Sequence, residues 1–206
     1  MVLMYNDDRI KGCSALSRNE ILAMTQHYLD TFPYEREHAM QFVDYVSGFD
    51  GEDLIRRNNF VGHLTASAMI FCSATRRFLL LKHHSLGLWL QPGGHIEASD
   101  GDLLTAARRE VEEETGLLAE EYRVAQFGDD EIPSVFEIDS HPIPANPKKN
   151  EAAHYHHDVR FLFLVKSEGD IHISRAESDD YGWFAVEQLP AGFNRDTIIR
   201  KLARMS

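Results

Sequence analysis

Cysteine is scarce in this chain: only Cys13 and Cys72 occur, and no CxxC pair is present. A disulfide framework needs several cysteines, and a thiolate zinc site needs closely spaced ones, so the sequence favours neither. Long apolar runs are also missing, and the opening MVLMYNDDRIKG is too short and too polar for a secretory signal. We therefore expect a cytoplasmic protein that has no membrane partner.

An excess of positive charge is missing as well. The chain has 21 Lys and Arg residues against 33 Asp and Glu residues, and its formal net charge is −12. Proteins that bind nucleic-acid polymers need clustered cations for the phosphate contacts, so we expect no such polymer as a partner. Free nucleotides stay open as ligands, because a divalent cation can screen their phosphates locally.

The length of 206 residues allows one well-packed core and a small appendage. Near the N-terminus, Ser17 and Glu20 resemble a capping box ahead of apolar residues at helical spacing. Pro33 ends that predicted helix, and a second one is predicted over about residues 35–46. We predict a helical N-terminal extension over residues 1–58 and a main domain over residues 59–206.

From Leu64 onward the hydrophobic pattern changes to short strands with two further helices. The proline-rich stretch from His141 to Ala153 is predicted to be an irregular loop. In the last helix, we expect Asp196 to be the cap and Ile198, Ile199 and Leu202 to be buried. This order predicts an α/β fold with a mixed sheet between helices. The predicted strands are 64–72, 77–82, 122–127, 134–138, 158–165 and 182–186, and the predicted helices are 103–115 and 196–204.

The stretch from Pro92 to Leu117 carries the clearest chemical signal. A Pro-Gly-Gly turn precedes a helix that bears Glu110, Glu113 and Glu114. Residues three and four positions apart share one helical face, so these carboxylates project into one small volume. Such carboxylates repel one another unless a cation lies among them, and hard oxygen ligands suit Mg²⁺ or Mn²⁺.

These residues resemble the signature of the Nudix hydrolases. The run from Arg109 to Leu117, REVEEETGL, matches the second half of that signature at every position. In the first half, the family usually has a glutamate six residues after the glycine, with seven residues between that glutamate and the arginine. This chain has Asp100 there, followed by eight residues, which we interpret as one extra residue in the loop. The resemblance implies a Nudix-type α/β/α sandwich with a mixed sheet, to which the helical segment 1–58 is added.

The resemblance also implies roles for individual residues. The expected catalytic residues are Glu110, Glu113, Glu177 and Arg109, where the arginine holds the loop by ion pairing. Glu177 is proposed as the base because it precedes Trp183 by six residues, a spacing similar to that in some family members. The alternative is that Glu177 is a surface carboxylate, and that Glu97 only caps backbone amides. The expected metal ligands are Gly94 through its carbonyl, Glu97, Glu110, Glu113 and Glu114.

The segment HYHHD, from His154 to Asp158, is not explained by the signature. At strand spacing, His154, His156 and Asp158 share one face. Three interpretations stay open: a transition-metal site, contacts with a substrate phosphate or base, and ordinary polar residues at a strand start. His95 and His141 are further candidates for the same cluster. We predict His154, His156 and Trp89 as substrate-binding residues, although for Trp89 a core or pocket-wall position is favoured over stacking on a nucleobase.

The function expected from these features is the Mg²⁺-dependent hydrolysis of a pyrophosphate bond in a small molecule. Substrates of this kind link a nucleoside diphosphate to another group, as in ADP-ribose, a nucleotide sugar or a nucleoside triphosphate. Two alternatives stay open: a non-catalytic Nudix-fold nucleotide-binding or regulatory module, and an isoprenoid diphosphate isomerase. The isomerase needs a reactive cysteine, whereas Cys72 lies within a predicted buried strand. A homodimer is possible.

Overall fold

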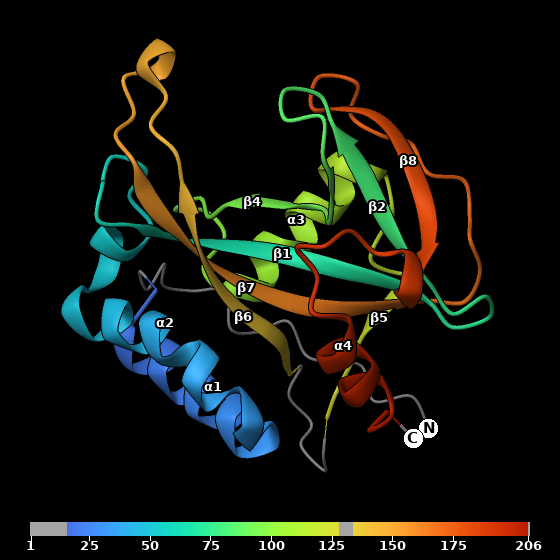
Figure 1. Cartoon of the computed structure of the whole chain (residues 1–206), viewed down its shortest axis with the longest axis horizontal. Coiled ribbons are helices and arrows are strands. Elements are labelled where there is room, and N and C mark those ends of the chain that lie inside the picture. The colour runs from blue at the N-terminus through green and yellow to red at the C-terminus, as the bar shows by residue number, and fades with distance from the viewer. Residues whose placement is uncertain (1–15, 128–133, 206) are drawn as a thin grey trace.

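A mixed β-sheet forms the centre of the structure, a computed structural model that describes residues 16–127 and 134–205. Figure 1 shows α3 behind this sheet, with α1 and α2 side by side below it. This arrangement confirms the predicted α/β/α sandwich. The helices are α1 (Arg18–Thr31), α2 (Arg36–Gly48), α3 (Leu103–Thr115) and α4 (Arg195–Leu202). The strands are β1 (His63–Cys72), β2 (Arg77–His83), β3 (Trp89–Leu90), β4 (Gly93–His95), β5 (Tyr122–Val124), β6 (Val135–Ile143), β7 (His154–Val165) and β8 (Ser178–Ala185).

The parallel pair β1 and β7 is the spine of the sheet. His63 lies opposite His156, and the pairing continues to Cys72 opposite Val165. The remaining strand pairs in the described residues are antiparallel: β2 and β4 pair with β1, β5 and β6 pair with β7, and β3 and β8 pair with β2. All ten residues of β1 are buried, as expected of a central strand that is covered on both faces.

The two predicted N-terminal helices are confirmed by α1 and α2. Ser17 is the N-cap of α1, but its side chain makes no capping hydrogen bond. The helix ends at Thr31, before Pro33. The buried face of α2 packs on the core through Ala39, Phe42, Tyr45 and Val46. The division into an N-terminal extension over residues 1–58 and a main domain over residues 59–206 stays a prediction.

The C-terminal helix differs from the prediction in which side chains it buries. Its N-cap is Asn194, not Asp196, because the Asn194 side chain accepts a hydrogen bond from the Thr197 amide. Ile199 is 48% exposed, whereas Lys201 is fully buried. The Lys201 ammonium donates to the Tyr28 hydroxyl at 3.0 Å, and further partners lie on β6 and before α2. A buried charge is tolerated only when it is paired, so this lysine ties α4 to the N-terminal helices.

The expected loop from His141 to Ala153 is shorter than predicted. Strand β6 continues through Pro142 to Ile143, and Pro142 lies opposite Tyr155 of β7. Proline lacks an amide hydrogen, but β6 pairs with no second strand among the described residues, so an edge position accommodates it. In the described ranges, no helix is long and apolar enough to cross a membrane.

Candidate active site

Helix α3 presents its glutamates because both of its ends are fixed. The Asp102 side chain accepts a hydrogen bond from the Thr105 amide at 2.7 Å and caps the N-terminus. Gly116 ends the helix in the left-handed conformation, with φ of 73°, which favours glycine. The apolar side of the helix is buried, Glu110 is nearly buried at its edge, and Glu114 is half-buried. Glu113 is exposed, with 57% of its side chain accessible.

The glycine strand β4 lies directly against these carboxylates. The Gly93 amide donates a hydrogen bond to Glu114 Oε2 at 3.3 Å. A Cβ atom on Gly94 would lie 2.6 Å from Glu110 Oε1, which is closer than real Cβ atoms approach oxygen. Glycine is therefore required at position 94 for the strand to approach the helix this closely. The backbone of Gly94 and the carboxylate of Glu110 thus line the same small space.

Glu177 reaches this space from a distant part of the sequence. The segment between β7 and β8 binds the end of α3 through backbone hydrogen bonds from His172 to Thr115 at 2.9 Å and from Ser174 to Glu114 at 3.3 Å. This contact brings the Glu177 side chain close enough to Glu114 for the two carboxylates to repel each other. The structure therefore brings Glu110, Glu114 and Glu177 together.

The electrostatics of the three carboxylates reflect their crowding. Burial, together with repulsion from Glu110 and Glu177, raises the pKa of Glu114 to about 8. Burial also raises the pKa of Glu110, and the neighbouring Arg109 only partly offsets this. A cation among the three groups would remove the repulsion and favour their ionised forms.

Arg109 binds this helix to the preceding loop. Its guanidinium donates to both carboxylate oxygens of Asp100, at 2.9 and 3.1 Å, and to the His95 carbonyl at 2.9 Å. It also donates to Glu110 at 2.9 Å and to Glu113 at 3.0 Å. With the extra loop residue, Asp100 still forms an ion pair with Arg109.

Glu97 makes hydrogen bonds within its own loop. Its backbone amide donates to Asp100 Oδ2 at 2.7 Å, and its exposed side chain accepts a long bond of 3.5 Å from the Ser99 hydroxyl. The contacts of Glu97 in the structure therefore belong to the loop.

Trp89 lies in a partly buried wall at the other end of the glycine turn. Its ring packs edge-on against Phe184 with centroids 5.0 Å apart, and the Lys82 ammonium lies 5.5 Å from the ring centre. These contacts agree with the interpretation of Trp89 as a pocket-wall residue. No feature of these contacts requires a nucleobase.

Histidines gather on the face of β4 opposite the glutamates. Strand pairing places His63 opposite His156, and places His95 beside them on the adjoining strand. His95 and His141 join the cluster, with ring centres 5.2 and 5.7 Å from that of His156. His154 lies 5.3 Å from His156. His63 is not among the site residues predicted from the sequence, although it alternates with Thr65 and Ser67 along β1, a pattern that could have indicated it.

The carboxylate oxygens of Asp158 are held by buried hydrogen bonds. Arg160 donates bonds of 2.8 Å to Asp158, Glu137 and Asp139, and all three carboxylates are largely buried. Asp158 also accepts bonds from hydroxyl groups on β1 at 2.8 and 2.9 Å. Because its oxygens are already engaged, Asp158 is a poor candidate for the metal ligand that the HYHHD pattern suggested. No local sequence pattern predicts the Arg160 network, because its carboxylates come from two strands.

Comparison with known proteins gives the family of this chain. Residues 62–202 match the NUDIX domain family, and this range is more than half of the 206 residues. The chain belongs to the Nudix family. Nudix enzymes generally use divalent metal ions, in agreement with a cluster of carboxylates on α3.

A curated relative of the chain carries the name of a pyrophosphohydrolase. A Lactococcus lactis protein named "Probable DHNTP pyrophosphohydrolase" is 30% identical over 134 residues, which cover 64% of this chain and 69% of that protein. Together, the family match and this relative support a Nudix pyrophosphohydrolase, the enzyme class that the glutamate motif predicts.

Two solved structures share the Nudix fold with this chain. The E. coli dihydroneopterin triphosphate pyrophosphohydrolase has a TM-score of 0.52 and 20% identity, and the match covers 66% of this chain and 92% of that one. A C. elegans Ap4A hydrolase binary complex has a TM-score of 0.51 and 20% identity, with coverage of 68% and 94%. At this identity, the likeness concerns the fold.

Proposed function

We propose that this Nudix protein hydrolyses the pyrophosphate bond of a small molecule in which a nucleoside diphosphate is linked to another group. ADP-ribose, a nucleotide sugar and a nucleoside triphosphate are substrates of this class. The observation that carries the proposal is the convergence of Glu110, Glu114 and Glu177 beside the Gly94 backbone. The name of the Lactococcus relative adds a pterin triphosphate to the substrates to be tested.

The residues present fit a hard divalent cation. The raised pKa values of Glu110 and Glu114 indicate carboxylates that lack a nearby counter-charge strong enough to offset their burial and repulsion. Mg²⁺ prefers oxygen ligands, and Mn²⁺ can replace it. We propose Glu110, Glu113 and Glu114 as ligands, together with the Gly94 carbonyl. Glu97 stays a further candidate, and it is exposed on the adjoining loop.

The bound ion would neutralise the diphosphate and lower the pKa of a coordinated water. The protein supplies the remaining roles. Glu177 is proposed as the base that accepts a proton from the attacking water, because its side chain lies beside Glu114 at the exposed edge of the cluster. Arg109 is a positioning residue that fixes Glu110 and Glu113 relative to the glycine loop.

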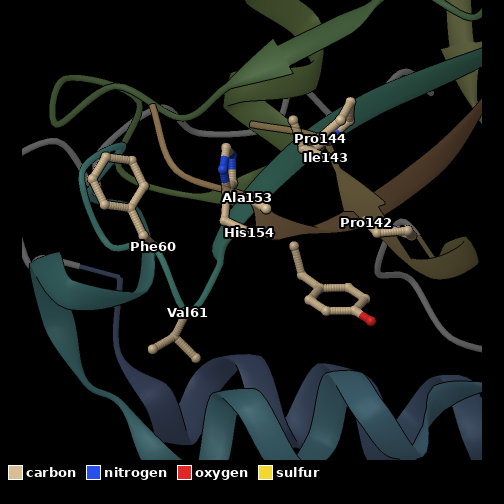
Figure 2. A pocket seen from close by; sticks show the side chains of 8 residues that line it. Phe60, Val61, Pro142, Ile143, Pro144, Ala153 and His154 are labelled. Carbon is tan, nitrogen blue, oxygen red and sulfur yellow. The ribbon is translucent and has the colours of Figure 1, made fainter. Parts of the chain in front are cut away.

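Substrate contacts are proposed for His154, His156 and Trp89. His154 borders an apolar pocket of about 490 Å³, which Figure 2 shows between Phe60, Val61 and the β6–β7 hairpin. A pocket with apolar walls and few polar groups suits the flat ring of a base or pterin. A homodimer and a cytoplasmic location stay predictions.

The experiment that tests this proposal is a substrate panel with Mg²⁺ or Mn²⁺. The panel contains nucleoside triphosphates, dihydroneopterin triphosphate, dinucleoside polyphosphates, nucleotide sugars, ADP-ribose and CoA. Glu114→Gln serves as the inactive blank, and Glu112→Gln is the matched control because Glu112 is exposed on the same helix. We expect turnover of at least one compound by the wild type and the control only.

Absence of turnover across this panel would favour the non-catalytic nucleotide-binding alternative. Equal turnover by Glu114→Gln and the wild type would contradict the assigned site. The isomerase alternative is disfavoured because Cys72 is fully buried at the end of β1 remote from His63. Cys13 lies outside the described residues.

A further inference from the structure

A second group of metal-type ligands lies outside the glutamate cluster. In the described part of the chain, His63, His95 and His156 each offer a ring nitrogen, and these three atoms lie within 4.8 Å of one another. His63 is almost completely buried, and the other two are half-buried. The ring centres of His63 and His156 are 4.7 Å apart, and those of His63 and His95 are 5.0 Å apart.

The sheet holds these histidines in place. His63 and His156 occupy directly paired positions on parallel strands, so their side chains leave the same face. His95 lies opposite Thr65 on the third strand, and Thr65 is two residues after His63 on the same face. Because three paired strands supply one ligand each, the positions of the ligands do not depend on a loop.

The spacing of the nitrogens suits a tetrahedral ion. Nε2 of His63 lies 3.1 Å from Nε2 of His95. Two imidazole nitrogens at about 2.0–2.1 Å from a tetrahedral zinc ion are roughly 3.3 Å apart. Small rotations of the side chains are therefore enough for both nitrogens to bind one ion.

The surroundings of the cluster favour neutral imidazole, which is the form that binds metals. Burial and the neighbouring histidines lower the pKa of His156 to about 2, and burial and His154 lower the pKa of His63 to about 4. An anion site would need protonated imidazoles instead. These directions support an assignment that rests on the geometry of the three rings.

Two further histidines support the inner three. His141 hydrogen-bonds through Nδ1 to Asp139 at 2.9 Å, and His154 bonds through Nδ1 to the Ala152 carbonyl at 2.8 Å. These bonds fix the ring orientations of His141 and His154, which border the inner three histidines. His154 also stacks on His63 with ring centres 4.9 Å apart.

We propose that His63, His95 and His156 bind a divalent transition-metal ion of the zinc type, at a site separate from the glutamate cluster. Three nitrogen ligands leave a position open for water or a substrate group. His154 belongs both to the surroundings of this site and to the wall of the apolar pocket in Figure 2.

The site is tested by metal binding to the full chain, independently of catalysis. Chelator-treated wild-type protein is titrated with Zn²⁺ and with Co²⁺ in the presence of excess Mg²⁺, which competes for the carboxylates. We expect one tightly bound Zn²⁺ per chain, the strong visible absorption of low-coordinate Co²⁺, and a higher melting temperature with Zn²⁺. The Glu114→Gln variant should give the same result.

Substitutions of single histidines test where the ion binds. His156→Ala and, separately, His95→Ala should weaken Zn²⁺ binding by at least about 100-fold and abolish the Co²⁺ absorption. His172→Ala is the matched control, because it removes an exposed imidazole from another region. Circular dichroism of each metal-free variant shows whether it is folded, and the wild-type titration decides the proposal if both variants unfold. Failure of the wild type to bind Zn²⁺, or binding by folded variants with wild-type affinity, would overturn the assignment.

Discussion

The two faces of strand β4 have opposite chemistry. Gly94 approaches the carboxylate of Glu110 on α3, whereas the next residue, His95, points its side chain toward His63 on the other face. One face thus gathers oxygen ligands and the other gathers nitrogen ligands, across the thickness of one strand. The His95 carbonyl even accepts a bond from Arg109, so the two clusters share a backbone while their side chains remain apart.

The two clusters also differ in how the chain builds them. Glu110 and Glu114 come from one turn of one helix, so helical geometry alone brings them together. His63, His95 and His156 come from three strands that lie far apart in the sequence, and only the sheet register joins them. A local motif therefore identifies the proposed hydrolytic site, whereas the histidine cluster depends on the pairing of the whole sheet.

Glu114→Gln should have the largest effect on catalysis. Loss of this proposed ligand removes several kcal/mol of charge stabilisation, so we expect kcat to fall by about 1,000-fold or more. Steady-state kinetics with Mg²⁺ on the substrate found in the panel measures this, with Glu112→Gln as the control. If the two clusters are independent, Zn²⁺ binding by Glu114→Gln stays unchanged. Loss of both kcat and Zn²⁺ binding would show that the two clusters are not independent.

Glu177→Gln should reduce kcat by roughly 100-fold and change KM little, because a general base contributes to the chemical step and not to binding. Glu187→Gln, an exposed glutamate just after β8, is the matched control. An unchanged kcat would remove Glu177 from the mechanism and would leave it as a surface carboxylate beside the site.

His156→Ala should raise KM by about 10-fold with a smaller change in kcat, since we propose that His156 contacts the substrate and is not among the reacting groups. This result would separate the roles of the two clusters in one enzyme. Unaltered kinetics with a lowered melting temperature would instead show that His156 stabilises the sheet and does not contact the substrate.

Asp100→Asn should have the smallest effect. The Asp100 carboxylate is almost fully buried against Arg109, so its neutralisation should lower the free energy of unfolding by about 1–3 kcal/mol, with a modest loss of kcat. Asp102→Asn is the control because asparagine also caps helices well. Equal denaturation midpoints for Asp100→Asn and the wild type would show that the longer loop does not depend on this ion pair.

The sequence predicted most of the elements that local patterns determine. The bounds of α3 agree with the prediction at both ends, because Asp102 and Gly116 mark them chemically. The Arg109 to Leu117 run also predicted the carboxylate face and the family. Glu177 was proposed from its spacing to Trp183, and the structure places it beside Glu114. The spacing alone did not reveal that backbone bonds to the end of α3 hold this segment.

Features that depend on long-range contacts were not predictable in this way. Lys201 resembles an exposed helix residue, yet it is buried because Tyr28 and Glu35 from the N-terminal helices pair with it. His63 entered the histidine cluster only through the register of β1 with β7. A single sequence gives the alternation within a strand, but it does not give the partner strand or the register.

The most direct test of the two-cluster account is a metal-specificity experiment on three proteins: the wild type, Glu114→Gln and His156→Ala. Bound Zn²⁺ is measured by elemental analysis after gel filtration, and bound Mn²⁺ is measured by electron paramagnetic resonance on the same samples. We predict that Glu114→Gln loses Mn²⁺ affinity and keeps Zn²⁺, whereas His156→Ala loses Zn²⁺ and keeps Mn²⁺. If either substitution, in a folded protein, abolishes the binding of both ions or of neither, the account of two separate sites is wrong.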